Sequence, residues 1–474
     1  MKVVLIQPKM RMRPMDTTLK TRMAPSLGLL TVANVIREEN EIKLLNENVE
    51  TCDFNSLEAD IAGITVTVDT LPRAVEIAGI LRSRGIPVVA GGIQITSDPE
   101  SAKGKFDVLC IGFAEKTWPA IMADLRSGEL KSRYSCTHLS PHEMMGPAYD
   151  MIDAGKYLFV NVISASRGCP FKCEFCYNSC ANIRNSYVNR PIEDVIRDIQ
   201  FLGKRHVMFI DDNFIGNPVW TRAFLKAIQP MKLKWQAAVS ANVADIPGLL
   251  DEMKEAGCKG LFIGFETLSE AALKGVSKNQ NSVKRYERLV EEIHKRGIMI
   301  NASFVFGLDG DTPDTFRHTL DWIVKNRIET VTSHILTPYP GTKQHKDMIE
   351  AGRIVNFNQR DYTTSEVVYT PLSMTAEELR TGYLKLYKDI YSWKNILRRM
   401  PAHQKVGYLL FNIFYRKYGH ITEKVCSAIG YSRVGRICEN LACHFTRKRA
   451  LLTSDHYKLY KKDLRKILKF CSEG

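Results

Sequence analysis

The sequence predicts an α/β protein made of two successive parallel-sheet units and a helical end. Three features of the 474 residues lead to this fold class. Residues 1–128 alternate short β-branched apolar runs with amphipathic segments, which is typical of a doubly wound, Rossmann-type domain. Residues 159–343 repeat a strand and a helix about every 30 to 40 residues, which favours a partial (β/α)6 barrel of the TIM type. Residues 344–474 lose this repeat and become helical and basic.

The first unit is expected to hold five strands with helices between them. Strands are expected at 2–6, 41–46, 61–66, 87–90 and 108–111, and helices at 26–38, 71–84 and 116–125. Doubly wound sheets bind ligands at the carboxyl ends of their strands. Thr65, Thr67, Gly91, Gly92 and Gly112 stand there and let a ligand approach the backbone. The alternative is that these loops simply turn the chain.

Residues 129–158 show no clear period and are interpreted as a linker. The barrel strands are expected at 159–164, 207–211, 234–240, 260–265, 299–306 and 330–335, with helices such as 191–202 and 282–296 between them. Function in a barrel concentrates where its strands end.

Charge and cysteine content exclude several classes of protein. The formal net charge is +14, but residues 391–474 hold 18 Lys/Arg and 5 Asp/Glu, so the rest of the chain is close to +1. The main body therefore needs no nucleic-acid partner. The first residues read as a buried strand rather than a signal peptide, and no run of about 18 apolar residues occurs. We therefore expect a cytoplasmic protein, in which the 12 cysteines favour metal binding over disulfides.

The strongest motif has Cys169, Cys173 and Cys176 in a C-x3-C-x2-C pattern directly after the first barrel strand. Iron–sulfur clusters usually take four thiolates. Three thiolates on one short loop can bind three corners of a cubane cluster and leave one iron open. Zinc with Cys180 as fourth ligand is the alternative, although structural zinc sites prefer two paired knuckles.

At these residues the chain resembles the radical SAM superfamily, with Phe175 as the aromatic residue of its C-x3-C-x-Φ-C motif. The resemblance implies a [4Fe-4S] cluster whose open iron is chelated by S-adenosylmethionine, with Phe175 beside the adenine. One-electron reduction, by a partner such as a flavodoxin or ferredoxin, then releases a 5′-deoxyadenosyl radical that abstracts a substrate hydrogen. The cofactor supplies this chemistry, and the protein holds and shields it.

The resemblance also suggests which strand-end residues contact S-adenosylmethionine. Asp211 and Asp212 stand where the superfamily often has a Gly-Gly-Glu that meets the methionyl ammonium, and a helix cap is the alternative reading. Glu266 resembles the ribose or amino-acid contact, or else caps the following loop. Ser240 and Leu308 fall where the superfamily makes further contacts to the nucleoside.

His334 and Tyr339 follow the sixth strand, would face the substrate, and are the catalytic candidates. A hydrogen-bonded core histidine is the alternative for His334.

The order of the units resembles the cobalamin-binding-domain class of this superfamily. The resemblance rests on segments 25–30, 89–92, 209–217 and 336–342. It implies a cobalamin-binding-like first domain, with Thr65, Thr67, Gly91, Gly92 and Gly112 as candidate cobalamin contacts. Members include methyltransferases, in which methylcobalamin methylates a substrate radical and a second S-adenosylmethionine restores it, and also ring-forming and dehydrating enzymes.

One departure concerns the cobalt ligand. Histidine-ligating cobalamin proteins carry D-x-H-x-x-G after the first strand, whereas residues 8–16 read PKMRMRPMD and the first histidine is His138. Histidine ligation from the first domain is therefore excluded. Relatives without that histidine either hold cobalamin through backbone loops or bind none.

The basic tail allows two readings. Residues 406–417 join an apolar aromatic run to basic residues, and Arg447–Arg449 and Lys461–Lys462 follow. Such helices suit peripheral contact with an anionic membrane surface, and a helical cap on the barrel is the alternative. Cys426, Cys438, Cys443 and Cys471 lack the spacing of a second cluster.

The sequence thus predicts a radical SAM enzyme, specifically a cobalamin-dependent methyltransferase acting on an unactivated centre of a small metabolite or lipid. A cobalamin-independent rearrangement, dehydration or ring closure is the alternative within catalysis. An iron–sulfur electron-transfer or regulatory protein is the alternative outside it, although such a protein gains nothing from an open iron ringed by polar strand ends.

Overall fold

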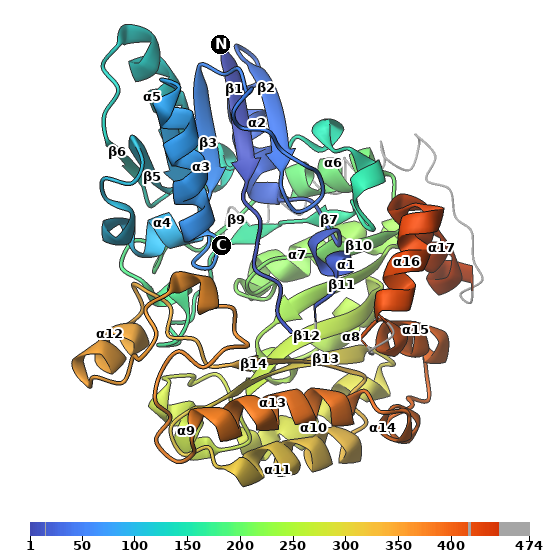
Figure 1. The fold of residues 1–474 in the computed structure, drawn as a ribbon. Helices are drawn as coiled ribbons and strands as arrows, with labels where there is room; N and C mark the ends of the chain where they lie inside the picture. Colours follow the sequence, from blue (N-terminus) through green and yellow to red (C-terminus); the bar gives the residue numbers. More distant parts are fainter. Residues whose placement is uncertain (15, 416–418, 445–474) are drawn as a thin grey trace.

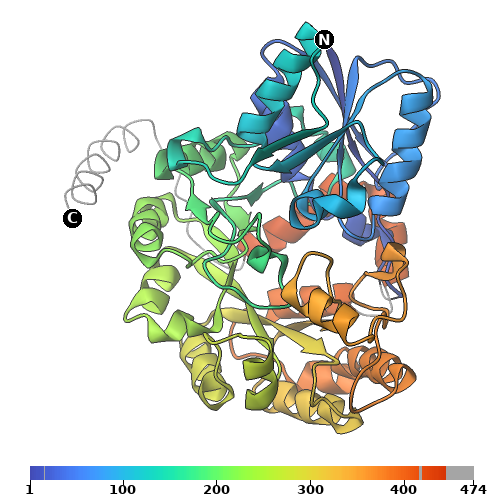
Figure 2. The same ribbon diagram turned by 90° about the vertical axis from the view of Figure 1, so that its left-hand side faces the viewer.

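The protein consists of two parallel sheets stacked along one axis. The computed structural model describes residues 1–14, 16–415 and 419–444. In Figure 1 the blue sheet of the first unit stands above the green and yellow sheet of the second, and its strands run downward toward it. Figure 2 shows the same stacking from the side. The carboxyl ends of the first sheet therefore lie at the junction of the two units.

The first sheet has six parallel strands in the order β2-β1-β3-β4-β5-β6. They are β1 (Lys2–Gln7), β2 (Glu41–Asn46), β3 (Ile61–Thr65), β4 (Val88–Gly91), β5 (Val108–Gly112) and β6 (Arg133–Cys136). The first five confirm the predicted strands. The sixth lies inside the stretch that the sequence led us to interpret as a linker, which is a correction. In β6 only Tyr134 is buried, so the strand lacks the apolar run that predicts a strand.

Helices cover both faces of the first sheet. They are α2 (Leu27–Ile36), α3 (Leu71–Ser83), α4 (Ile93–Ser97) and α5 (Ala114–Ser127). The short α1 (Thr18–Thr21) lies elsewhere, with Leu19 packed against Leu158 and Val434. Ile77 of α3 packs in one apolar cluster with Val4 and Ile64. Ala33 of α2 and Trp118 of α5 pack in another cluster on the opposite face. Alternate side chains of buried strands thus meet helices on both sides, as in doubly wound sheets.

The second sheet also has six parallel strands, in the order β14-β13-β12-β11-β10-β7. They are β7 (Val162–Ile163), β10 (His206–Phe209), β11 (Lys234–Val239), β12 (Cys258–Glu266), β13 (Met299–Phe306) and β14 (Thr330–Ile335). All six predicted strands are confirmed. The edge strands β7 and β14 do not pair, so the barrel is partial.

Helices pack on the outer face of this sheet. They are α6 (Ile192–Leu202), α7 (Pro218–Ile228), α8 (Leu249–Glu255), α10 (Val283–Lys295) and α11 (Pro313–Lys325). The short α9 (Glu270–Gly275) and α12 (Lys343–Glu350) follow the carboxyl ends of β12 and β14. The core between helices and strands is rich in fully buried aromatic side chains, among them Trp235, Phe265 and Phe304. Such rings bury large apolar areas and hold the strand ends in place.

The C-terminal region contributes α13 (Ala376–Ile390), α14 (Trp393–Arg398), α15 (Lys405–Tyr415), α16 (Gly419–Ile429) and α17 (Tyr431–His444). In α15, Tyr408 is fully buried and Asn412 donates to the carbonyl of Glu329 at 3.0 Å. The described part of the apolar run 406–417 therefore packs as a cap on the barrel. Residues 447–449, 461–462 and Cys471 lie outside the described residues. Within residues 1–14, 16–415 and 419–444, we find no helix that meets the length and hydropathy of a membrane span.

Candidate active site

The loop that follows β7 carries the three cysteines of the motif. A short strand, β8 (Ser166–Arg167), pairs with β9 (Val188–Asn189), so that the start and the end of the loop lie side by side. Gly168 has a φ of 78°, and a Cβ there would lie 3.3 Å from the backbone of Tyr187. Glycine thus permits the turn that leads into Cys169.

The surroundings of the thiols fit a cluster. Burial raises the pKa of Cys169 to about 11 and that of Cys176 to about 12, and the nearby Cys173 adds to both shifts. The amide N–H of Phe171 donates to the sulfur of Cys169, and that of Asn178 to Cys176. Such buried thiols become thiolates when they bind metal, and N–H donors stabilise cluster sulfurs. The donor set therefore suits a [4Fe-4S] cluster with three protein ligands.

The zinc alternative fits less well. Among the His, Cys, Asp and Glu side chains of the described part of the chain, no three converge on one point as a single ion requires. A four-iron cluster needs no such convergence, because each thiolate binds a different iron. Cys180, the fourth ligand of that alternative, is buried beside Asp98 of the first unit.

Ion pairs hold the cluster loop on both sides. Arg167 pairs with the buried Glu115 of the first unit at 2.8 Å. On the opposite side, Glu174 accepts a hydrogen bond from Ser277 at 2.8 Å and pairs with Lys343 at 3.3 Å. The loop is thus fixed between the first unit and the loops that follow β12 and β14.

The inner face of the second sheet is open to solvent. Phe262, in the middle of β12, is 36% exposed, whereas its neighbours Leu261 and Ile263 are buried. Ile210, just after β10, is 47% exposed beside the buried Phe209. A packed (β/α)8 barrel would fill this space with side chains. The exposure shows that the partial barrel is hollow at its mouth, where the strand-end residues lie.

The two aspartates after β10 have different environments. Asp211 is buried, and its carboxylate accepts hydrogen bonds from the backbone of Ala165 and Ser166. Burial raises the pKa of Asp211 to about 6. Asp212 is exposed at the mouth and accepts from Asn178 and the amide of Gly168, while the surrounding protein raises its pKa. The S-adenosylmethionine contact stays a prediction for both, and Asp212 has the carboxylate that is open to a ligand.

Glu266 lies beside the aromatic residue of the motif. It forms an ion pair with Lys278, and both side chains are 9% exposed. The Lys278 ammonium stands 5.8 Å from the centre of the Phe175 ring. Glu266 has a φ of 65°, at a bulge where the register between β12 and β13 shifts. A non-glycine residue in this strained region often marks a functional site. Lys278 was not predicted, because no motif surrounds it in the sequence.

Ser240 and Leu308 differ in their exposure to solvent. Ser240, after β11, is partly exposed, and its hydroxyl donates to Asn242 at 2.6 Å. Leu308 is buried in the core. The amides of Gly307 and Leu308 donate to Asp311 at 2.9 and 3.1 Å, which fixes this loop. Ser240 is thus accessible to a ligand and Leu308 is not, and the contact with S-adenosylmethionine stays a prediction for both.

His334 and Tyr339 stand deep at the junction of the units. His334 hydrogen-bonds Thr364 at 3.0 Å, and burial, with help from Arg13 of the first unit, lowers its pKa to about 3. The Tyr339 ring lies 5.8 Å from that of Tyr177, next to the cluster loop. Both side chains line the same region, and their catalytic roles stay predictions.

Arg13, Asp16 and Lys20 of the first unit also lie near this region. Arg13 pairs with Asp16 at 3.1 Å and donates to Thr364 at 3.4 Å. Lys20 pairs with the same Asp16 carboxylate at 2.6 Å. The loop that would carry a cobalt-binding histidine therefore contributes charged groups opposite His334. No sequence pattern pointed to this contact, because it joins residues some 350 positions apart.

The predicted glycines of the first sheet are partly explained by packing. At Gly92, with a φ of 100°, a Cβ would lie 2.9 Å from the backbone of Val66. At Gly112, with a φ of 83°, a Cβ would collide with the carbonyl of Cys136 in β6. Gly91 has only ordinary contacts. Two of the three glycines thus serve the fold itself.

The threonines of the first sheet lie at its open edge. Thr65 ends β3, and the exposed Thr67 donates to Asp69 at 2.7 Å. Burial raises the pKa of Tyr339, and the charge of Asp69 adds to the shift. The Tyr339 ring also lies 5.8 Å from that of Tyr177, next to Cys176. The edge of the first sheet and the cluster loop therefore face one shared region around Tyr339.

Known proteins share this sequence pattern. The chain is 28% identical over 412 residues to bacteriochlorophyllide d C-12(1)-methyltransferase of Chlorobaculum tepidum, covering 85% of this chain and 90% of that protein. It is 26% identical over 356 residues to hopanoid C-2 methylase of Rhodopseudomonas palustris, covering 71% and 66%.

Solved structures share the fold. The cobalamin-dependent S-adenosylmethionine radical enzyme OxsB, with aqua-cobalamin bound, matches with a TM-score of 0.62 at 15% identity over 99% of this chain and 84% of that one. The methyltransferase TsrM from Kitasatospora setae, with cobalamin and a [4Fe-4S] cluster bound, matches with a TM-score of 0.59 at 18% identity over 74% and 78%. The predicted fold class is thereby confirmed.

Residues 163–323, which include the cluster loop and most of the second sheet, match the family described as the radical SAM superfamily. This family implies a [4Fe-4S] cluster and S-adenosylmethionine as cofactors, and the three thiols and the hollow strand ends fit both. The chain therefore contains a radical SAM superfamily domain.

Proposed function

We propose that this chain is a cobalamin-dependent methyltransferase that methylates an unactivated centre of a small metabolite or lipid. One observation carries the proposal: the Tyr339 ring lies 5.8 Å from the ring of Tyr177, next to Cys176 on the cluster loop, and Asp69, at the edge of the first sheet, is close enough to contribute to the raised pKa of Tyr339. A corrin at that edge and S-adenosylmethionine at the cluster would therefore face one substrate space. The two relatives named above are both methylating enzymes.

The residues of the first unit suit a corrin held without a cobalt-binding side chain. Residues 8–16 offer no histidine, and Arg13 and Asp16 are paired with each other. The exposed Thr67 hydroxyl can hydrogen-bond the amide-bearing rim of a corrin, and Gly91, which has no side chain, lets a corrin approach the edge of the sheet. When bound, cobalamin would supply the methyl group for a substrate radical.

The second unit would position and shield S-adenosylmethionine. Cys169, Cys173 and Cys176 hold the cluster, and Phe175 with Lys278 forms one wall. Burial keeps His334 neutral above about pH 3, so it offers hydrogen bonds rather than a charge to the substrate.

Anaerobic reconstitution with iron, sulfide and hydroxocobalamin tests this function. Absorption spectroscopy should show a bound corrin together with the cluster. Reduction in the presence of S-adenosylmethionine should yield both 5′-deoxyadenosine and S-adenosylhomocysteine. If 5′-deoxyadenosine forms alone and no corrin binds, the chain is a radical enzyme of another kind and the methyltransferase proposal fails.

A further inference from the structure

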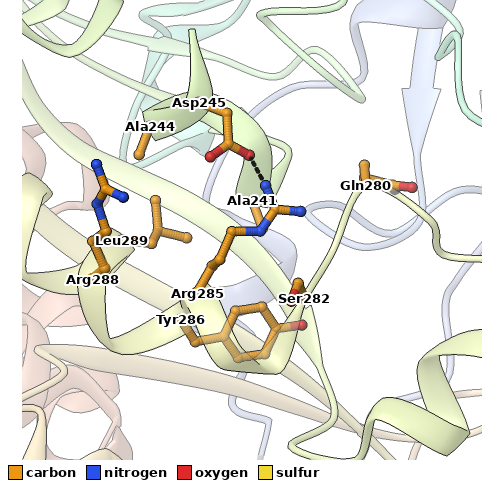
Figure 3. Close-up of a pocket in the computed structure, with 9 residues that line it drawn as sticks. All are labelled: Ala241, Ala244, Asp245, Gln280, Ser282, Arg285, Tyr286, Arg288 and Leu289. Carbon is orange, nitrogen blue, oxygen red and sulfur yellow. Dashed lines mark hydrogen bonds and ion pairs between the residues drawn. The ribbon is translucent and has the colours of Figure 1, made fainter. Parts of the chain in front are cut away.

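We propose that the surface around the pocket formed by α10 and the turn after β11 is the docking site of an acidic one-electron carrier protein that reduces the cluster. The pocket is drawn in Figure 3, and its floor includes Gln280, Arg285 and Arg288. The inference rests on the radical chemistry of the proposed function and concerns the reductant rather than the substrate.

The path from this surface to the cluster is short. Gln280 lines the pocket, and its amide nitrogen donates to the sulfur of Cys173 at 3.5 Å. Cys173 is 8% exposed, so Gln280 covers it from the outside. A backbone hydrogen bond of 3.1 Å from Glu174 to Val276 joins the same two loops. One side chain therefore separates the surface pocket from a cluster ligand.

The other two thiols have no such contact with the pocket. Among the described residues, no side chain that lines the pocket is hydrogen-bonded to Cys169 or Cys176, whereas Gln280 is hydrogen-bonded to Cys173. Cys173 is therefore the cluster ligand that this pocket reaches.

The surface around the pocket carries positively charged side chains. Lys284, Arg285 and Arg288 are exposed in the first two turns of α10, whose N-terminal end adds a partial positive charge. Figure 3 shows Arg285 bonded to Asp245, at 2.7 Å. No carboxylate of the described residues lies within ion-pair distance of Arg288. Lys172, also exposed, stands next to Cys173 in the chain.

The acidic groups nearby leave part of this charge uncompensated. Asp245 is paired with Arg285, Glu287 with Lys325 at 2.7 Å, and Glu270 accepts hydrogen bonds from Ser282 and from the amide of Lys284. Lys172, Lys284 and Arg288 have no ion pair among the described residues. Since residues 1–390 together carry a net charge of only about +1, the positive surface is a local feature. Complementary charge steers an anionic partner and orients it on a small, transient interface, which is the usual size for redox complexes.

The transfer from the carrier to the cluster involves a single electron. One electron leaves the carrier, which is oxidised by one electron, and enters the cluster, which is reduced by one electron. No bond is made or broken and no proton moves in this step.

The test uses the full chain with its reconstituted cluster and reduced flavodoxin as the probe. Arg285→Glu/Arg288→Glu reverses two charges at the pocket. Lys103→Glu/Lys105→Glu reverses two exposed charges that precede β5, at the opposite end of the first sheet, and is the matched control. Binding of oxidised flavodoxin by calorimetry is the first readout. The rate of S-adenosylmethionine cleavage with reduced flavodoxin, compared with reduced methyl viologen, is the second.

We expect flavodoxin to bind Arg285→Glu/Arg288→Glu at least tenfold more weakly and to drive cleavage correspondingly more slowly, with the viologen-driven rate unchanged. The control should match the parent chain. Equal binding by the two double variants, or equal losses in both, would overturn the docking site. If viologen drives no cleavage in any chain, the proposed function fails, whereas the calorimetry still reports on the docking surface.

Discussion

At the scale of single residues, the carboxylates after β10 show what a sequence can and cannot predict. The pattern placed Asp211 and Asp212 at a strand end, and both are there. Neighbouring residues of an extended chain point to opposite sides. Asp211 therefore points toward the chain that follows β7 and accepts hydrogen bonds from the amides of Ala165 and Ser166, while Asp212 faces the mouth of the barrel. The sequence alone does not say which of the two takes which side.

Asp311 offers a test of the same buried-carboxylate chemistry. Burial raises its pKa to about 6, so the folded protein binds this proton more tightly than the unfolded chain does. Its contribution to the free energy of unfolding is then complete below about pH 4 and is lost as the pH rises through about 6. A shift of about two pKa units corresponds to about 3 kcal/mol.

Asp311→Asn keeps an oxygen for the amides of Gly307 and Leu308 but cannot titrate. Between pH 4 and pH 7, urea unfolding should show a smaller fall in stability for this variant than for the parent chain. Asp314→Asn, at a position whose side chain is 70% exposed, is the control and should follow the parent. If Asp311→Asn keeps the full pH dependence, the assigned shift is wrong.

At the scale of elements, long buried strands were predictable and short polar ones were not. β12 and β13 are nine and eight residues long and mostly apolar, long enough for the pattern of a strand to show. β6 is four residues with one buried side chain, and α4 is five residues, so neither reaches the length at which periodicity is informative. The need for glycine at 112 was not predictable either, because it follows from the contact of Gly112 with β6.

The loop after β14 joins the two units and carries a second prediction. Gly341 has a φ of 89°, and a Cβ there would collide with the carbonyl of Ser97 at the end of α4. Gly341→Ala should therefore lower the free energy of unfolding by about 3 kcal/mol or more, through backbone strain and a forced shift of α4.

Gly352→Ala is the matched control, because Gly352 has a φ of 65° with nothing within 4 Å of a new Cβ. It should cost only the backbone strain, about 1 to 2 kcal/mol. Chemical denaturation of both variants measures the difference. Equal losses would mean that the loop does not pack on α4 as described.

The tail beyond α17 carries the membrane hypothesis. Residues 445–474 hold nine Lys/Arg against three Asp/Glu. Near an anionic surface each such cation contributes about 1 kcal/mol. The full chain should float with vesicles of phosphatidylglycerol and phosphatidylcholine, and a chain ending at residue 444 should float much less. This shorter chain keeps α15 and its buried Tyr408, so its fold is preserved. Equal flotation of the two chains would remove the hypothesis.

At the scale of the whole molecule, the order of the units and the cluster motif were predictable, because each is local in sequence. The shared space between the units was not. It depends on Arg13 reaching Thr364 and on Asp69 facing Tyr339, contacts between residues hundreds of positions apart. The motif located the cluster, and only the fold shows what lies opposite it.

The whole account depends on the cluster loop, and its most direct test is reductive cleavage of S-adenosylmethionine by cysteine variants. Cys169→Ala, Cys173→Ala and Cys176→Ala should each lose the cluster absorption and the formation of 5′-deoxyadenosine after anaerobic reconstitution. Cys180→Ala, the control at the remaining cysteine of the same segment, should keep both. Retained cleavage in any of the first three variants, or its loss in Cys180→Ala, would contradict a cluster held by Cys169, Cys173 and Cys176.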